Sequence, residues 1–172
     1  KNPFSERTLI PNFEPYPDTF NYINPALSLI TGKGFNISRE GRIIKPNVPP
    51  LYSLSLLPAF IIKPDPRMAY YGNATLAFIS LLFFWLILRR IFVNKFVIFL
   101  LLILYITSYF IYWVPSLIMA ENLTLTLFLI SVYLLLSKPM IINQILLAVL
   151  AIGLYATKYA NIPITLTIIF LS

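Results

Sequence analysis

Long apolar runs separated by short polar breaks fill the chain from residue 71 to its end. About 20 apolar residues in a helix, each rising about 1.5 Å, cross the roughly 30 Å hydrocarbon core of a bilayer. The runs therefore predict four membrane-spanning helices and the start of a fifth, at about 71–88, 96–114, 117–136, 140–155 and 162–172. We expect an all-α protein, built as a polytopic transmembrane helical bundle.

The first seventy residues are more polar and predict a loop outside the bilayer. Apolar side chains recur every three or four residues from Phe20 to Ile30, which indicates a helix that Pro25 interrupts and the glycines of 31–34 end. After a polar, hairpin-like stretch at 36–47, about a dozen apolar residues up to Ile62 are too few to cross a bilayer. We expect two interfacial helices in an outer region, 1–70, followed by a transmembrane region, 71–172.

The composition limits the chemistry that this chain can perform. It is 59% hydrophobic and contains neither cysteine nor histidine, which excludes disulfides, thiol nucleophiles, imidazole bases and the commonest zinc ligands. The net charge is +7, but the basic residues are dispersed around the apolar runs, so we expect contact with membrane phosphates and no nucleic-acid partner. The chain begins at Lys1 and ends inside an apolar run, and we expect a piece of a longer protein.

The charged residues of the second half predict which side of the membrane each loop faces. Short basic loops mark the cytoplasmic side. The loops after the first and third expected spans carry the basic residues Arg89, Arg90, Lys95 and Lys138. Alternation of the spans then places Asp18, Glu121 and Lys158 on the outer side, with Glu121 about one helical turn inside its span. Ionisable groups at membrane depth usually face a cavity or a partner, so this convergence indicates a functional site.

Each of these three residues also has a structural interpretation. Asp18 follows a proline and precedes Thr19, which suits the N-cap of a helix. Glu121 suits a capping role beside Asn122 or a structural pairing with Lys158. Lys158 lies between two tyrosines and suits an anchor at the membrane interface.

Five features, in this order, resemble the GT-C membrane glycosyltransferases, in particular bacterial enzymes similar to protein O-mannosyltransferases and to the lipid A aminoarabinose transferase. They are Asp18 with Tyr22 and a helix ending in Gly32-Lys33-Gly34-Phe35, Pro49-Pro50-Leu51-Tyr52, a span ending in Arg89-Arg90, Ala120-Glu121-Asn122-Leu123, and Gly153-Leu154-Tyr155-Ala156-Thr157-Lys158. The chain departs from the family in having Thr19 where many relatives have glutamate, and in lacking the histidine that protein O-mannosyltransferases have before Pro49.

The resemblance implies an enzyme of the bacterial cytoplasmic membrane whose active site faces outward. It would transfer a sugar from a polyprenyl-phosphate-linked donor to a hydroxyl of a lipid, glycan or protein acceptor. By resemblance Asp18 takes the place of the catalytic base. The expected substrate-binding residues are Tyr22, Lys45, Tyr52, Glu121 and Lys158.

The chemistry of such a transfer needs a base for the incoming hydroxyl and positive charge for the departing phosphate. A carboxylate and a basic residue at the outer interface supply both, and the oxygens of Asp18 and Glu121 would also suit a divalent metal such as Mg²⁺ or Mn²⁺. Two other classes stay open. A secondary transporter would also carry intramembrane charges, although it predicts an internal repeat that this sequence lacks. A non-catalytic membrane assembly subunit would use Asp18 only structurally.

Overall fold

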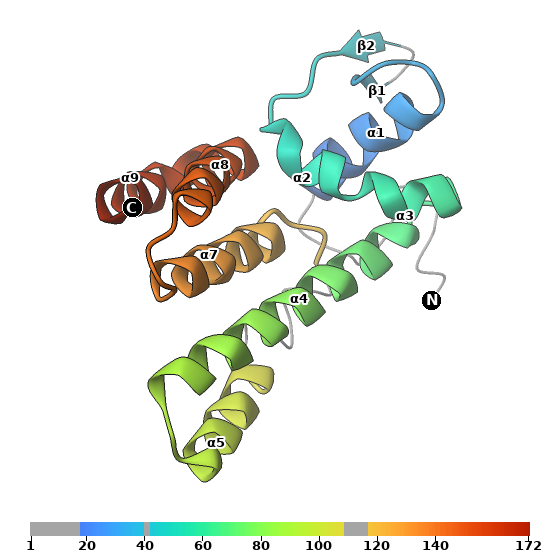
Figure 1. Ribbon diagram of the computed structural model, residues 1–172. Coiled ribbons are helices and arrows are strands. Elements are labelled where there is room, and N and C mark those ends of the chain that lie inside the picture. Colours follow the sequence, from blue (N-terminus) through green and yellow to red (C-terminus); the bar gives the residue numbers. More distant parts are fainter. Residues whose placement is uncertain (1–17, 40–41, 109–116) are drawn as a thin grey trace.

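The computed structural model describes residues 18–39, 42–108 and 117–172, and helices dominate them (Figure 1). The expectation of an all-α protein holds in this coarse form, with one two-stranded hairpin added. The expected loop 1–17, the second half of the span at 96–114 and the turn at 114–116 lie outside the described residues, wholly or in part. The elements are α1 (Asp18–Ile30), β1 (Ile37–Arg39), β2 (Arg42–Ile44), α2 (Pro50–Ser55), α3 (Leu57–Ile62), α4 (Met68–Ile91), α5 (Lys95–Ile106), α7 (Glu121–Leu135), α8 (Ile141–Thr157), the 3₁₀ turn η2 (Tyr159–Asn161) and α9 (Ile162–Leu171).

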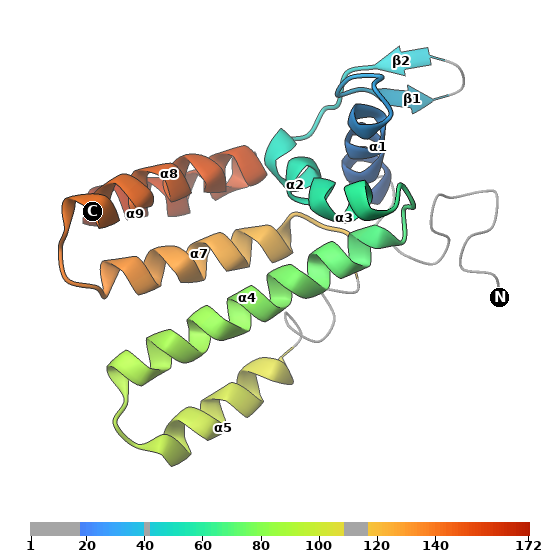
Figure 2. The same ribbon diagram turned by 45° about the vertical axis from the view of Figure 1, so that its right-hand side comes forward.

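The long helices lie beside one another, and the short elements gather at one end of them (Figure 2). Helix α4 packs against α7 and α5, and α8 packs against α7 and α9. Helices α1, α2 and α3, with the β1–β2 hairpin, sit at the end where α4 and α7 begin and α8 ends. Contacts of α2 with α8 and of α3 with α4 join the two parts. We call this the capped end of the bundle.

Helix α1 ends where the glycines predict. Gly32 has φ +74° and Gly34 has φ +76°, a left-handed backbone that glycine adopts without a Cβ penalty. The N–H of Lys33 donates to the carbonyl oxygen of Ser28 over 2.9 Å, which closes the last turn. The expected interruption at Pro25 was wrong, because the helix runs unbroken through this buried residue. The Ser28 hydroxyl donates to the side chain of Asn24, one turn earlier, across the same segment.

The second interfacial helix is split in two. Helix α2 ends at Ser55 and α3 begins at Leu57, so the single helix expected up to Ile62 was wrong. Pro58 lies in the first turn of α3, where its ring and its missing N–H prevent the helical bond to the residue four positions earlier. Leu56, at the junction, is fully buried. The break therefore places the Leu56 side chain in the core.

One apolar core holds the capped end together. Its buried members come from α1, α2, α3 and the junction between them, the first turn of α4, and the start of α7 with the segment before it. They are Tyr22, Ile23, Ala26, Tyr52, Leu56, Phe60, Ala69, Ile118, Ala120 and Leu123. Helix α4 approaches closely at Gly72, where an added Cβ would lie 3.0 Å from the Leu56 side chain. The capped end is thus fixed to the helix bundle by packing and not only by chain connection.

Of the described helices, α4 alone has the length and composition to cross a membrane. It contains 24 residues, which corresponds to about 36 Å. The other apolar helices have 10–17 residues and are too short by the same criterion. The described residues therefore show one candidate span, where the sequence predicted four spans and the start of a fifth. Helix α7 begins four residues later than expected, and in the segment before it the carbonyl oxygen of Leu117 accepts from Nδ2 of Asn73 over 2.7 Å.

Apolar side chains cover the outside of several helices. No described residue of α5 is buried, and Phe96, Phe99 and Leu104 are largely exposed. Helices α8 and α9 likewise expose large apolar side chains, including Ile152 and Phe170. Large exposed apolar patches are typical of surfaces that contact a membrane or a partner.

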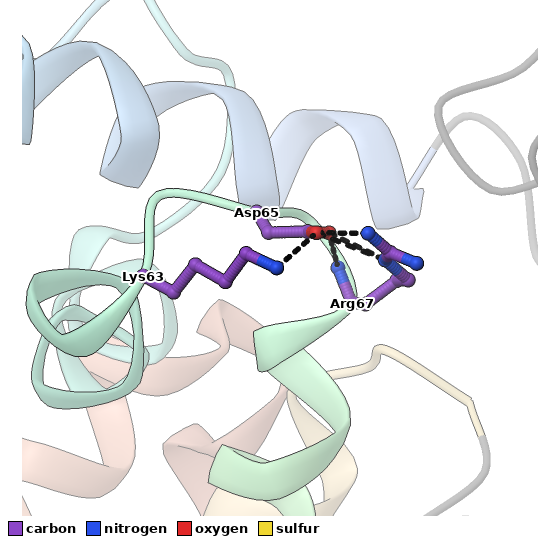
Figure 3. A network of polar contacts seen from close by, with 3 residues as sticks. All are labelled: Lys63, Asp65 and Arg67. Atoms are coloured by element: carbon purple, nitrogen blue, oxygen red, sulfur yellow. Dashed lines mark hydrogen bonds and ion pairs between the residues drawn. The ribbon is translucent and has the colours of Figure 1, made fainter.

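The expected turn at 63–67 is fixed by a small ionic network (Figure 3). Oδ1 of Asp65 accepts from the backbone N–H and from Nε of Arg67, each over 2.9 Å, and Lys63 Nζ lies 3.7 Å from Oδ2. These bonds lower the pKa of Asp65 to about 2. A carboxyl group whose pKa is lowered by folding stabilises the folded state at pH values above its ordinary pKa of 3.8. This contribution is lost as the pH falls through about 2.

Candidate functional site

Two of the predicted site residues meet directly at the capped end. Nζ of Lys158 donates to Oε1 of Glu121 over 2.5 Å. We expected Glu121 about one turn inside its helix, but it is the first residue of α7. Lys158 directly follows α8. The two side chains are 30% and 42% exposed, so the pair is reachable from outside. The structural pairing that the sequence left open is therefore present.

A buried amide that the sequence did not single out reinforces the same junction. Nδ2 of Asn161 donates to Oγ1 of Thr124 on α7 and to the carbonyl oxygen of Leu154 on α8, each over 3.0 Å. Asn161 is almost fully buried, in the turn η2 that precedes α9. It positions the turn next to Lys158. In the sequence Asn161 lies between Lys158 and Pro163, which favours a turn. Its hydrogen-bond partners cannot be predicted from the sequence.

Tyr22 connects Asp18 to the Glu121 region. Burial, followed by the negative charges of Asp18 and Glu121, raises the pKa of the Tyr22 hydroxyl to about 12. Both carboxylates therefore lie within electrostatic reach of one phenol, although they are about a hundred residues apart in the chain. Asp18 is the first residue of α1 and is half-buried, so its charge also suits the positive end of that helix.

Tyr52 lies beneath this group as a buried support. Its ring meets the Tyr22 ring edge-on at 4.8 Å between centroids, and its hydroxyl donates to Oδ1 of Asn73 over 2.7 Å. Asn73 in turn donates to the carbonyl oxygen of Leu117, just before α7. Burial raises the pKa of Tyr52, and Glu121 adds to that increase. Tyr52 thus links α2, α4 and the entry to α7, while Asn73 is a positioning residue that sequence patterns missed.

Lys45 lies apart from the other predicted residues. It is exposed and follows strand β2 of the hairpin. Within the described parts of the chain no hydrogen bond or ion pair joins it to the group at the capped end. The structure therefore brings together Asp18, Tyr22, Tyr52, Glu121 and Lys158, and leaves Lys45 on the rim.

Two buried polar atoms beside this group have no hydrogen-bond partner in the part of the chain that the structure describes. They are Nδ2 of Asn122, the residue after Glu121, and Oγ of Ser53, the residue after Tyr52. Buried polar groups are nearly always bonded, so each is suited to a water molecule or a ligand group. They add an amide NH₂ group and a hydroxyl to the polar groups of the capped end.

The residues present do not make a metal centre of the expected kind. Among the described residues no three acidic, histidine or cysteine side chains gather closely enough to hold an ion. Of the two carboxylates proposed as ligands, Glu121 is already engaged by the ammonium of Lys158. Divalent Mg²⁺ and Mn²⁺ prefer several oxygen ligands. The described carboxylates at the capped end therefore do not fit such an ion.

The arrangement at the capped end combines a half-buried carboxylate, a carboxylate bonded to an ammonium group, and a buried phenol between them. A carboxylate accepts protons and an ammonium group binds phosphate or carboxylate oxygens. Such a set suits acid–base chemistry on a hydroxyl beside an anionic group. Comparison of the chain with protein-family models, with curated proteins and with solved structures gives no match.

Proposed function

We propose that this chain carries the catalytic end of an integral membrane glycosyltransferase of the GT-C kind. The enzyme transfers a sugar from a polyprenyl-phosphate donor to an acceptor hydroxyl at the outer face of a bacterial cytoplasmic membrane. One observation carries the proposal: Asp18 and Lys158, 140 positions apart in the chain, come to the same end of the bundle around Tyr22 and Glu121. The resemblance of the sequence features supports the reaction class.

The dimensions of α4 support the membrane placement. Arg67 precedes the helix and Arg89 lies in its last turn, 22 positions later, which corresponds to about 33 Å along a helix. The hydrocarbon core of a bilayer is about 30 Å thick. The charges at both ends of α4 thus reach the two interfaces, and the exposed apolar side chains of α5, α8 and α9 face lipid.

The opposite end of the bundle supports the orientation. Nη1 of Arg90, at the end of α4, donates to Oγ of Ser137 over 2.6 Å, so the loops after α4 and α7 meet. Basic residues flank the first loop, with Arg89 and Arg90 before it and Lys95 after it, and Lys138 lies in the second. Short basic loops favour the cytoplasmic side, and the capped end then faces outward.

In this reaction the Asp18 carboxylate accepts the proton of the acceptor hydroxyl. The hydroxyl oxygen attacks the anomeric carbon, the bond from that carbon to the phosphate oxygen breaks, and the electron pair leaves with the phosphate. Lys158 has three N–H donors, of which Glu121 accepts one, so two remain for phosphate oxygens. Glu121 therefore orients the ammonium group toward the donor.

The test is Asp18→Asn in the full-length protein, in membranes supplied with polyprenyl-phosphate donors carrying radiolabelled mannose, glucose or aminoarabinose. The asparagine caps a helix about as well as aspartate but cannot serve as the base. We expect loss of the labelled sugar from the lipid donor to fall by at least about two orders of magnitude, the usual contribution of a general base. Expression and extraction should stay normal.

Asp65→Asn is the matched control, because Asp65 is also an acidic residue of the outer region but bonds only within its own turn in the described contacts. It should leave transfer unchanged. If Asp18→Asn retains near wild-type transfer, Asp18 is not the base and only stabilises the start of α1. A wild-type protein that uses none of the donors would favour the transporter or the assembly subunit.

A further inference from the structure

A groove runs between α4 and α5 at the end of the bundle opposite the candidate site. It consists of two cavities of about 350 and 260 Å³ that share Trp85 and Leu102. The first is lined by Trp85, Arg89, Lys95, Ile98, Phe99 and Leu102. The second is lined by Phe78, Leu81, Leu82, Trp85, Leu102 and Ile106. The groove therefore has a basic mouth near the α4–α5 loop and an apolar interior farther along.

The mouth is electrostatically prepared for an anion. The Arg89 guanidinium lies over the Trp85 ring at 5.0 Å from its centroid, which holds it at the edge of the groove. Within the described residues neither Arg89 nor Lys95 forms an ion pair. After Asp65 the sequence contains one acidic residue, Glu121, and Lys158 engages it at the far end. Two basic side chains thus face the mouth without an acidic neighbour from α4 or α5.

The depth of the groove matches one leaflet of a bilayer. Arg89 at the mouth and Phe78 in the interior are 11 positions apart on α4, which corresponds to about 16 Å. Half of a roughly 30 Å hydrocarbon core is about 15 Å. Phe78 and Phe99 are 68% and 60% exposed, so the walls open sideways, as a lipid entering from the membrane requires.

We propose that this groove binds an anionic glycerophospholipid of the inner leaflet. Its phosphate lies between Arg89 and Lys95, and one acyl chain runs past Trp85 and Leu102 toward Ile106. The charge of the mouth selects the anionic headgroup, and the apolar interior selects the chain. This site is separate from glycosyl transfer; it rests on the membrane placement of α4 proposed above and is tested by binding alone.

The experiment is native mass spectrometry of the purified full-length protein in detergent, titrated with phosphatidylglycerol or phosphatidylcholine. We expect discrete phosphatidylglycerol adducts at concentrations where phosphatidylcholine gives few. The double variant Arg89→Gln/Lys95→Gln should bind phosphatidylglycerol about 30-fold more weakly, since each basic side chain near anionic lipid contributes about fivefold in affinity. Lys138→Gln, a basic residue of the neighbouring loop outside the groove, is the control and should bind normally.

A second variant tests the apolar interior separately. Leu102→Trp adds volume where the two cavities join and leaves the charges in place, so it should also weaken phosphatidylglycerol binding. Glycerol 3-phosphate, which has the anionic group without chains, should not compete. The proposal is overturned by equal binding of both lipids, by an equal loss in Lys138→Gln, by full binding in Leu102→Trp, or by competition from glycerol 3-phosphate. Lys95→Gln alone, at an exposed position, replaces the double variant if that protein fails to fold.

Discussion

The Glu121–Lys158 pair decides whether the candidate site is functional or structural. We consider three variants of the full-length protein: Glu121→Gln, Lys158→Met and the two combined. Each single change removes one charge and keeps much of the side-chain volume. The combined variant closes a double-mutant cycle, which isolates the coupling between the two charges from the other effects of each substitution.

The exposure of the pair sets the expected magnitude. Glu121 and Lys158 are 30% and 42% exposed, so water screens their attraction although the atoms lie 2.5 Å apart. Exposed ion pairs couple by about 0.2–1 kcal/mol, whereas breaking a buried pair costs about 3–5 kcal/mol. We therefore expect a coupling in the free energy of unfolding below about 1 kcal/mol. Transfer from the polyprenyl-phosphate donor should nevertheless fall in Lys158→Met, because the phosphate loses its cation.

The free energy of unfolding is measured by denaturant titration in mixed micelles, followed by circular dichroism. Asn161→Ala provides the comparison, because this buried amide joins the same helices through two hydrogen bonds. Loss of its bonds should cost about 1–3 kcal/mol, more than either charge variant. A Glu121–Lys158 coupling above about 3 kcal/mol, or normal transfer by Lys158→Met, would refute the functional interpretation.

Two further predictions concern the support of the site and its side of the membrane. Tyr52→Phe removes the hydroxyl that donates to Asn73 and leaves a buried acceptor, so the free energy of unfolding should fall by about 1–3 kcal/mol, as denaturant titration will show. An unchanged value would mean that water replaces the hydroxyl. Single cysteines are informative in this cysteine-free chain. One at Tyr159 should react with an impermeant thiol reagent from outside and one at Asn94 should not; equal labelling of both would contradict the proposed topology.

Local patterns in the sequence predict where several elements begin and end. The end of α1 was predicted from Gly32 and Gly34, which have the left-handed backbone that glycine adopts most readily. The hairpin β1–β2 and the turn around Asp65 were predicted from short polar stretches of the sequence. These features depend on neighbours within a few positions. Such information is present in the sequence itself.

Features that depend on distant partners were not predicted. The segment that enters α7 is bonded by Asn73, 44 positions away, whose side chain donates to the carbonyl oxygen of Leu117. The junction at Asn161 depends on Thr124, 37 positions away. The spacing of neighbouring residues does not mark either asparagine as a structural support. The convergence of charges was predicted only through alternation of spans, a rule that carries no distances.

The two ends of the bundle differ in their charged residues, because the described acidic residues all lie toward the capped end, and this difference joins both proposals. The capped end contains carboxylates and an ammonium group together, with Asp18, Glu121 and Lys158 around a buried phenol. The opposite end carries basic side chains, among them Arg89 and Lys95 at the mouth of the groove. Mixed charges allow a proton to be accepted beside a departing phosphate, whereas basic charge alone favours retention of an anionic lipid. In the orientation that we propose, the basic end faces the cytoplasm and the acidic residues of the capped end face the outer side.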